Sequence, residues 1–305
     1  MNDFAVYRFS IPLRQPLGLK GKLHTERHGL LIEREGRWAE ASPLPGFSQE
    51  NLDETIAGLD RETLASVAMR FAISSLDQAP IERLVVPYNG LLLGNSQTVL
   101  QGVDECVRSG CRSVKLKVGR TGLQEDIDLV CAVRDRLPQS VSLRLDANQA
   151  WSFEDAIHFT KQTKVVDLEY IEEPLCDPRR LETLYFETGI RYALDESLMT
   201  LESLDAFPHV AALICKPTLL GGIDRISQLA ATGKKLVFSA AFESGVGTIR
   251  VAQLAASLAP EVPAGLDTLD WFTDDLLFES PIKRDGVFTV RGEPQVDTTK
   301  LERVL

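Results

Sequence analysis

The sequence predicts an α/β protein in which a parallel barrel follows a small α+β unit. Three observations support this fold class. From residue 84 onward, short apolar runs recur every 20 to 30 residues, with helical stretches between most of them, and this is about the length of a βαβ repeat. The first 80 residues are different, with strands first and helices after them. Polar side chains stand where the apolar runs end, which is where (β/α) barrels build their sites.

The N-terminal strands and helices come first. Residues 4–13 alternate between apolar and polar side chains, as a half-buried strand does, and 29–34 and 38–41 are two shorter strand candidates. Helical stretches follow at 51–59 and 62–76. Strands that precede helices in this way are typical of a small α+β unit.

Eight apolar runs mark the predicted barrel strands. Eight parallel strands make a closed barrel more economical than an open sheet, although a doubly wound sheet shares the same alternation and stays the alternative. The helices between them include 125–137, 153–163 and 247–258. The runs lie at residues 84–93, 113–118, 141–145, 166–171, 190–194, 210–215, 236–240 and 264–269.

The composition of the chain indicates which kinds of binding partner it favours. The chain carries 33 Lys and Arg against 44 Asp and Glu, a net charge of −11, which disfavours nucleic acid and anionic membrane surfaces but allows a small anionic substrate in a locally basic pocket. No apolar run approaches the roughly 18 residues of a membrane span, and no signal peptide is evident. The five cysteines form no CxxC pair, which suits a reducing compartment. We therefore expect a cytoplasmic protein.

Charged side chains stand at the ends of consecutive apolar runs. Period-2 alternation places Lys115 and Lys117 on one strand face, and Arg144, Asp146 and Asn148 likewise on one face. The successive ends read KxK, DxN, EEP, DES and KP. Their spacings are 29, 26, 23 and 21 residues along the series Lys117, Asp146, Glu172, Asp195 and Lys216. Each step is about one βα repeat, so we expect these side chains to meet at one mouth of the barrel.

These residue types suggest a chemistry. Carboxylates from three consecutive strands, with no His or Cys among them, form an oxygen donor set that suits Mg²⁺. Lysines beside them could exchange a proton α to a carboxylate, because a divalent ion stabilises the enediolate that develops. Such a lysine must be neutral to act as a base, and nearby cations would lower its pKa. The chain has no Walker-type phosphate loop, nucleophile elbow or HExxH motif.

The strand-end motifs together resemble the enolase superfamily, in its muconate-lactonizing branch. The resemblance implies a modified (β/α)7β TIM-like barrel over residues 83–275. It also implies an α+β capping domain over 1–82, completed by about 276–305. Asp146, Glu172 and Asp195 resemble the Mg²⁺ ligands, with Mn²⁺ as an alternative ion.

The same resemblance implies roles for the lysines. Lys117 resembles the base that removes the α-proton and returns it to the departing hydroxide. Lys216 resembles the opposing cation that stabilises the enediolate. Lys115 is expected to hydrogen-bond the substrate carboxylate and to lower the pKa of Lys117. Asn148 and Glu196 are expected to contact these groups and hold them in position.

A narrower resemblance lies in the loop at 42–50, which reads SPLPGFSQE, together with VYR at 6–8 and GLDTLD at 265–270. These strings are similar to the o-succinylbenzoate synthase family of the proteobacterial type. Its members dehydrate 2-succinyl-6-hydroxy-2,4-cyclohexadiene-1-carboxylate to 2-succinylbenzoate in menaquinone biosynthesis and are often monomers. We expect a monomer with a small carboxylate substrate.

Contacts to the succinyl end of the substrate are expected from several segments. A capping loop at 19–29 is predicted to cover the site. The side chains expected to contact substrate are Arg14, Lys20, Lys22, Arg144, Ser239 and Ser244.

Other enzymes with the same machinery remain alternatives, namely an N-succinylamino acid racemase, a dipeptide epimerase or a muconate cycloisomerase. An epimerase would need an acidic motif near the eighth strand to hold the substrate amine, and Asp267 and Asp270 lie there. A non-catalytic metal- or ligand-binding barrel is the alternative of another class. It predicts a missing lysine or carboxylate, and none is missing from the strand-end series.

Overall fold

The computed structural model describes residues 4–19, 21–59, 66–164 and 166–305 of the 305-residue chain. Its largest sheet is parallel, and its seven strands stand in chain order. They are β5 (Gly90–Leu92), β6 (Ser113–Lys117), β7 (Ser142–Asp146), β8 (Tyr170–Glu172), β9 (Tyr192–Leu194), β10 (Ala212–Cys215) and β11 (Leu236–Phe238).

A short segment at Ala264 and Gly265 closes this sheet into a barrel. Ala264 pairs in parallel with Tyr88, just before β5, and Gly265 pairs in parallel with Ser239, just after β11. Backbone hydrogen bonds of 2.8–2.9 Å hold the segment on both sides. Glycine is required here because a Cβ at position 265 would lie 2.6 Å from the Ser239 hydroxyl. The predicted α/β barrel is confirmed, and the open doubly wound sheet is excluded.

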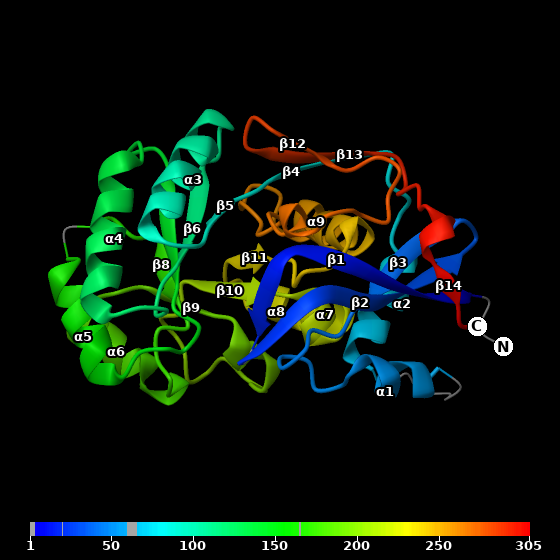
Figure 1. Cartoon of the computed structure of the whole chain (residues 1–305). Helices are drawn as coiled ribbons and strands as arrows, with labels where there is room; N and C mark the ends of the chain where they lie inside the picture. The colour runs from blue at the N-terminus through cyan, green and yellow to red at the C-terminus, as the bar shows by residue number, and fades with distance from the viewer. Residues whose placement is uncertain (1–3, 20, 60–65, 165) are drawn as a thin grey trace.

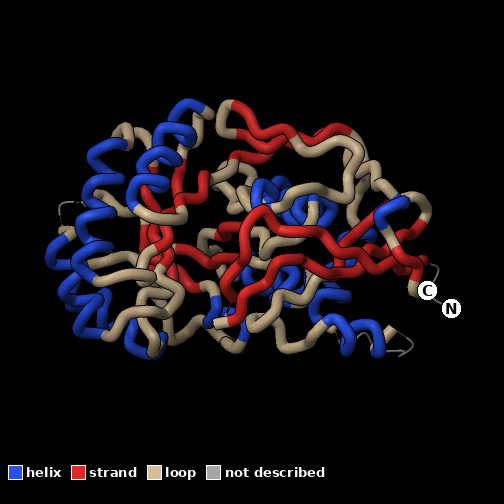
Figure 2. Tube along the Cα trace, in the orientation of Figure 1, coloured by secondary structure: helices blue, strands red, loops and turns tan. Residues whose placement is uncertain are grey.

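Helices pack around the outside of the barrel strands (Figure 1), and Figure 2 shows several of them flanking the strands on one side. The predicted helices at 125–137, 153–163 and 247–258 are confirmed to within two residues at either end. No helix in the described parts of the chain is long and apolar enough to cross a membrane. The helices that follow barrel strands are α3 (Ser96–Arg108), α4 (Leu123–Arg136), α5 (Phe153–Gln162), α6 (Leu181–Thr188), α7 (Pro217–Leu220), α8 (Ile223–Ala231) and α9 (Gly245–Leu258), with short 3-10 turns at Pro178–Arg180, Glu196–Met199, Leu269–Trp271 and Thr298–Lys300.

A second, antiparallel sheet forms the N-terminal unit, and the C-terminal strand β14 pairs with β1 at its edge. One face of this sheet packs apolar side chains against α2 in a small core of its own, with Val6, Leu30 and Ile32 meeting Met69 and Ala72. Burial of such side chains, at about 25 cal/mol per Å² of apolar surface, holds the helix on the sheet. The elements are β1 (Ala5–Leu19), β2 (Lys22–Arg34), β3 (Arg37–Ala41), α1 (Leu52–Ala57), α2 (Val67–Leu76) and β14 (Glu302–Arg303).

The strands of this unit are longer than predicted. Residues 22–29 belong to β2 and pair with β1, so the loop expected at 19–29 is in large part a hairpin arm. The arm carries many polar side chains, and backbone hydrogen bonds to β1 hold it in place. Backbone pairing leaves no apolar–polar alternation in the sequence, so the sequence pattern does not predict this part of the strand. Lys20 lies outside the described residues, as do positions 62–65 of the helix predicted at 62–76.

The strand predicted at 84–93 is two strands in different sheets. β4 (Arg83–Pro87) pairs antiparallel with β13 (Val287–Arg291), which in turn pairs with β12 (Ile282–Arg284), whereas β5 belongs to the barrel. The change of sheet falls between Tyr88 and Asn89, whose N–H groups donate to Gly286 and Ala264 respectively. A continuous apolar run carries no sign of this change, because both halves are apolar in sequence even though Val85 of β4 is exposed.

Candidate active site

A cavity of about 640 Å³ lies at the C-terminal ends of the barrel strands. Three lysines from opposite sides of the barrel line it, Lys115 and Lys117 at the end of β6 and Lys216 just after β10. The end of β1, from Gln15 to Leu19, covers it together with side chains of the loop that follows β3. This is the mouth at which the sequence predicts a site.

Strand pairing brings the predicted carboxylates into one row. In the barrel register, Lys117 stands opposite Asp146, and Asp146 stands opposite Glu172. The Lys117 Nζ lies 2.6 Å from Asp146 Oδ2, and the Lys115 Nζ lies 3.0 Å from the same oxygen and 3.3 Å from Glu172 Oε1. Across the mouth, the Lys216 ammonium contacts Asp195. The structure therefore brings the predicted lysines and carboxylates together.

Burial and neighbouring charges act on these groups in opposite directions. Burial raises the pKa of Glu172 well above its usual range, and the nearby charge of Asp146 adds to the effect. Burial also acts to raise the pKa of Asp146, but Lys117 and Lys115 outweigh it and hold that pKa well below its ordinary value. Of these two carboxylates, Glu172 is thus the one whose charged form is disfavoured overall.

The carboxylates beside Lys115 and Lys216 act on the pKa of these two lysines. Burial does lower the pKa of Lys115, but the charges of Glu172 and Asp146 outweigh it and raise the pKa above its ordinary value. The pKa of Lys216 is raised in the same way, with burial opposed by Asp195. In this arrangement both side chains are held as ammonium ions.

The donor set fits a hard divalent cation. As the side chains stand, no group of three or more His, Cys, Asp or Glu in the described part of the chain is arranged to hold a metal ion, and lysine ammoniums contact the carboxylates instead. Asp146, Glu172 and Asp195 are nonetheless buried together at adjacent strand ends. Buried carboxylates that stand together in this way suit Mg²⁺, whose ligands are oxygens.

Glu173, the second glutamate of the pair at the end of β8, binds the backbone of the neighbouring turn. Its carboxylate accepts hydrogen bonds from the N–H groups of Asp195 and Ser197, both at 2.9 Å, and from the Ser197 hydroxyl at 3.0 Å. It is fully buried, and its φ is +40°. Glu173 therefore fixes the turn that carries Asp195, and the first glutamate of the pair, Glu172, is the one beside the lysines.

Three of the weaker predicted residues lie in or next to the cavity. Asn148 lines it and accepts from the Lys117 Nζ at 2.8 Å, while its own amide donates to Glu196 at 2.9 Å. The second oxygen of Glu196 is buried without a hydrogen-bond partner in the described structure. Ser239 lines the cavity at the end of β11.

Two others do not line the cavity. Ser244 is fully buried, caps α9, and donates its hydroxyl to Glu40. Arg144 points into the barrel below Asp146, where its guanidinium pairs with Glu169 at 2.8 Å. Both side chains therefore bind other segments of the fold and are not available to contact a ligand in the cavity.

The covering segment also differs in detail from the predicted one. The Arg14 guanidinium donates to the Phe272 carbonyl at 2.7 Å, and Lys22 is exposed; neither is among the cavity-lining residues that the structure describes. The sequence reasoning missed Arg120 and Trp271, which line the cavity. Arg120 follows the end of β6 by three residues, which is the signal that would have found it.

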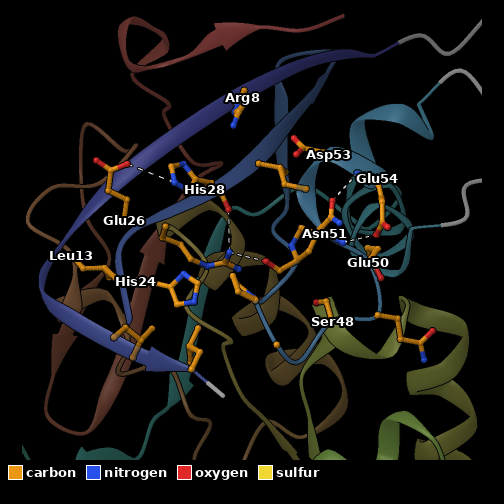
Figure 3. Close-up of a pocket in the computed structure, with 18 residues that line it drawn as sticks. Arg8, Leu13, His24, Glu26, His28, Ser48, Glu50, Asn51, Asp53 and Glu54 are labelled. Carbon is orange, nitrogen blue, oxygen red and sulfur yellow. Dashed lines mark hydrogen bonds and ion pairs between the residues drawn. The ribbon is translucent and has the colours of Figure 1, made fainter. Parts of the chain in front are cut away.

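A second cavity, of about 430 Å³, lies on the N-terminal unit (Figure 3). Leu17 and Leu19 line both cavities, so the end of β1 is a wall between them. Beneath it, the buried Arg27 guanidinium donates to the carbonyls of Ser42, Pro43 and Phe242 at 2.6–3.0 Å. Arg27 thereby ties the arm to two loops that border the site.

Comparisons with known proteins agree with this geometry. Residues 99–294 match the family model described as enolase C-terminal domain-like, and residues 1–79 match that of the MenC N-terminal domain. The o-succinylbenzoate synthase of Yersinia pseudotuberculosis is 32% identical over 300 residues, covering 88% of this chain and 91% of the relative. That of Haemophilus influenzae is 32% identical over 310 residues, covering 88% and 90%.

Solved structures share the whole fold at lower identity. The L-Ala-D/L-Glu epimerase of Bacillus subtilis is 18% identical with a TM-score of 0.79, and covers 96% of each chain. The o-succinylbenzoate synthase of Thermosynechococcus elongatus, solved with magnesium in its active site, is 23% identical with a TM-score of 0.75, over 92% of this chain and 96% of that one. These likenesses establish the fold.

Proposed function

This chain belongs to the o-succinylbenzoate synthase family of the enolase superfamily, and we propose that it dehydrates 2-succinyl-6-hydroxy-2,4-cyclohexadiene-1-carboxylate to 2-succinylbenzoate in menaquinone biosynthesis. One observation carries the proposal of mechanism. Lys115 and Lys117 flank a buried row of carboxylates, and Lys216 faces them from across the cavity. A substrate between the lysines has a proton acceptor on one side and a cation on the other.

Lys117 is the base in this proposal. It takes the proton from the carbon that bears the ring carboxylate, and the electron pair moves into that carboxylate as an enediolate. The pair then returns to the ring as the carbon–oxygen bond to the hydroxyl breaks. Lys117 gives its proton to the departing oxygen, so that water leaves and the ring becomes aromatic. Asn148, which hydrogen-bonds the Lys117 Nζ at 2.8 Å, orients the amine.

The other lysines stabilise charge. Lys216 is held as an ammonium by Asp195, and so presents a cation to the enediolate. Lys115 is held as an ammonium by Glu172 and Asp146 and serves as a donor to the substrate carboxylate. Neither needs to change its protonation state during the reaction.

Asp146, Glu172 and Asp195 are proposed to hold Mg²⁺, with Mn²⁺ as an alternative. The bound ion would supply positive charge against the enediolate and would compensate the negative charge of these buried carboxylates. Burial of the three side chains and the raised pKa of Glu172 support this assignment. The Glu173 carboxylate keeps the Asp195 turn in place for it.

The domain division is proposed as a capping domain over 1–82, completed by about 276–305, on a (β/α)7β barrel over 83–275. The separate small core of the N-terminal sheet and its pairing with β14 support it. Ser239 is proposed to contact substrate, since it lines the cavity. A cytoplasmic location and a monomeric state stay predictions.

The test follows the loss of the cyclohexadiene absorbance in the ultraviolet. We expect turnover by the wild type with Mg²⁺, none with EDTA, and a loss of at least about 10³-fold for Lys117→Ala. Lys161→Ala, on the exposed surface of α5, is the matched control and should keep wild-type activity. If the wild type with Mg²⁺ leaves the diene unchanged, the proposed reaction is wrong, and N-succinylamino acids and dipeptides would be assayed for racemisation.

A further inference from the structure

One wall of the cavity carries an acid among cations. Asp267 is the one acidic side chain among the described cavity-lining residues, and its side chain is 21% exposed. The other charged side chains that line the cavity are Lys115, Lys117, Arg120 and Lys216. A carboxylate in this wall, if left uncompensated, would repel an anionic ligand.

A lysine from outside the barrel compensates Asp267. The Lys283 Nζ lies 2.5 Å from Asp267 Oδ1 and 2.5 Å from Asp270 Oδ2, and the second Asp267 oxygen accepts from the Leu91 N–H at 3.2 Å. The Lys283 side chain is only 18% exposed, and burial acts to lower its pKa. Asp267 outweighs that effect and raises the pKa of Lys283, so Lys283 stays an ammonium ion. Both oxygens of the cavity acid are therefore engaged.

The position of Lys283 in the fold fixes this contact. It stands in the middle of β12, which pairs with β13, and β13 pairs with β4 just before the chain enters the barrel at β5 (Figure 1). The next residue, Arg284, is 81% exposed and contacts Asp285. The hairpin thus directs one basic side chain to the cavity wall and the next one to solvent.

We propose that Lys283 determines the charge specificity of the cavity by neutralising Asp267, so that the wall accepts a ligand with two carboxylates and does not retain an ammonium group. The inference rests on the proposed function, whose substrate and product both carry two carboxylates. Lys283 acts through Asp267 and is a positioning residue. Its contribution is to substrate affinity, because it lies behind the acid and does not line the cavity.

The test compares Lys283→Met, Lys283→Arg, the double variant Lys283→Met/Asp267→Asn, and the matched control Arg284→Met. Steady-state kinetics give KM and kcat, and calorimetry with Mg²⁺ gives the Kd of 2-succinylbenzoate and of the dipeptide L-Leu-L-Tyr, which carries an ammonium group and a single carboxylate. For Lys283→Met we expect KM and the Kd of 2-succinylbenzoate to rise about tenfold, the size expected for one uncompensated charge near the ligand, with kcat changed less than about threefold. The increase should shrink at high salt, and binding of the dipeptide should strengthen.

The remaining variants separate charge from structure. Lys283→Arg and the double variant should return KM to within about threefold of wild type, since neither leaves an uncompensated negative charge at position 267. Arg284→Met should match the wild type throughout. Thermal unfolding identifies any variant that fails to fold. If Lys283→Met fails to fold, the KM of the double variant tests whether the charge of Asp267 is the cause.

Two results would overturn this inference alone. One is an active wild type with an unchanged KM in a folded Lys283→Met variant. The other is a double variant as defective as Lys283→Met, which would give Lys283 a structural role. Absence of turnover in the wild type would instead refute the proposed function, and the 2-succinylbenzoate Kd values would still test Lys283.

Discussion

The adjacent glutamates after β8 allow the two roles at this site to be separated by stability measurements. Glu172 lies beside Lys115 and is proposed as a metal ligand, whereas Glu173 holds the turn that carries Asp195. The perturbations are Glu172→Gln and Glu173→Ala. Glu187→Gln, on an exposed position of α6, is the control.

The structure sets the size of each effect. Glu173→Ala leaves the N–H groups of Asp195 and Ser197 and the Ser197 hydroxyl without their acceptor. An unsatisfied buried donor costs about 1–3 kcal/mol, and water that enters the void recovers part of this, so we expect a loss of about 3 kcal/mol in the free energy of unfolding. Burial and Asp146 disfavour the charged form of Glu172, so the neutral side chain of Glu172→Gln should leave the metal-free protein as stable as the wild type or about 1 kcal/mol more stable.

The assay is urea unfolding in EDTA and again in Mg²⁺. Mg²⁺ at a hundred times its Kd should stabilise the wild type and Glu187→Gln by about 2.7 kcal/mol and should leave Glu172→Gln unchanged. Glu173→Ala should lose stability in EDTA already. The reverse pattern, with Glu172→Gln unstable in EDTA and Glu173→Ala intact there but unresponsive to Mg²⁺, would refute the assignment of the two glutamates.

Three further outcomes are expected. Lys117→Met should abolish turnover and exchange of the substrate α-proton for deuterium while the Kd of 2-succinylbenzoate, measured by calorimetry, stays within about tenfold of wild type, since the amine rather than the fold is removed. Burial raises the pKa of Glu40 to about 7, so the native state binds a proton between pH 4.5 and 7 that the unfolded state releases. The free energy of unfolding should therefore fall as pH rises through this window, by up to about 3 kcal/mol relative to Glu40→Gln, and parallel urea titrations of the two proteins would show equal slopes if this is wrong. Trp271 lines the cavity 5.8 Å from the Phe242 ring, so 2-succinylbenzoate should change the intrinsic fluorescence of the wild type and leave Trp271→Phe nearly unchanged; an equal change in both would place the ligand elsewhere.

The proton-transfer side of the site could be predicted from the sequence because it depends on local rules. Alternation along one strand puts Lys115 and Lys117 on the same face, and a spacing of one repeat puts Asp146 and Glu172 at equivalent heights on the next strands. Because neighbouring parallel strands are hydrogen-bonded to each other, side chains at the same height on them come into contact. No information from distant parts of the chain is needed for this row.

The failed assignments show where local rules stop. Arg144 shares a strand face with Asp146, as predicted, but lies two residues deeper, where the barrel interior provides Glu169 as a partner. Ser244 stands near the end of a barrel strand, yet its hydroxyl is used by Glu40 of the other sheet. Alternation gives the face of a side chain but not its depth or the partner that reaches it.

The substrate-binding side of the cavity depends on segments that no sequence period connects. Arg27 reaches the Phe242 carbonyl from the N-terminal sheet, and Lys283 reaches Asp267 from a hairpin beyond the last barrel strand. The strand-end lysines and carboxylates suit racemases, epimerases and dehydrating enzymes alike, so they cannot select among substrates. Selection by charge must come from the rest of the wall, where Lys283 makes the difference between an uncompensated and a compensated Asp267. The residues that decide the chemistry and those that decide the substrate are thus drawn from different parts of the chain.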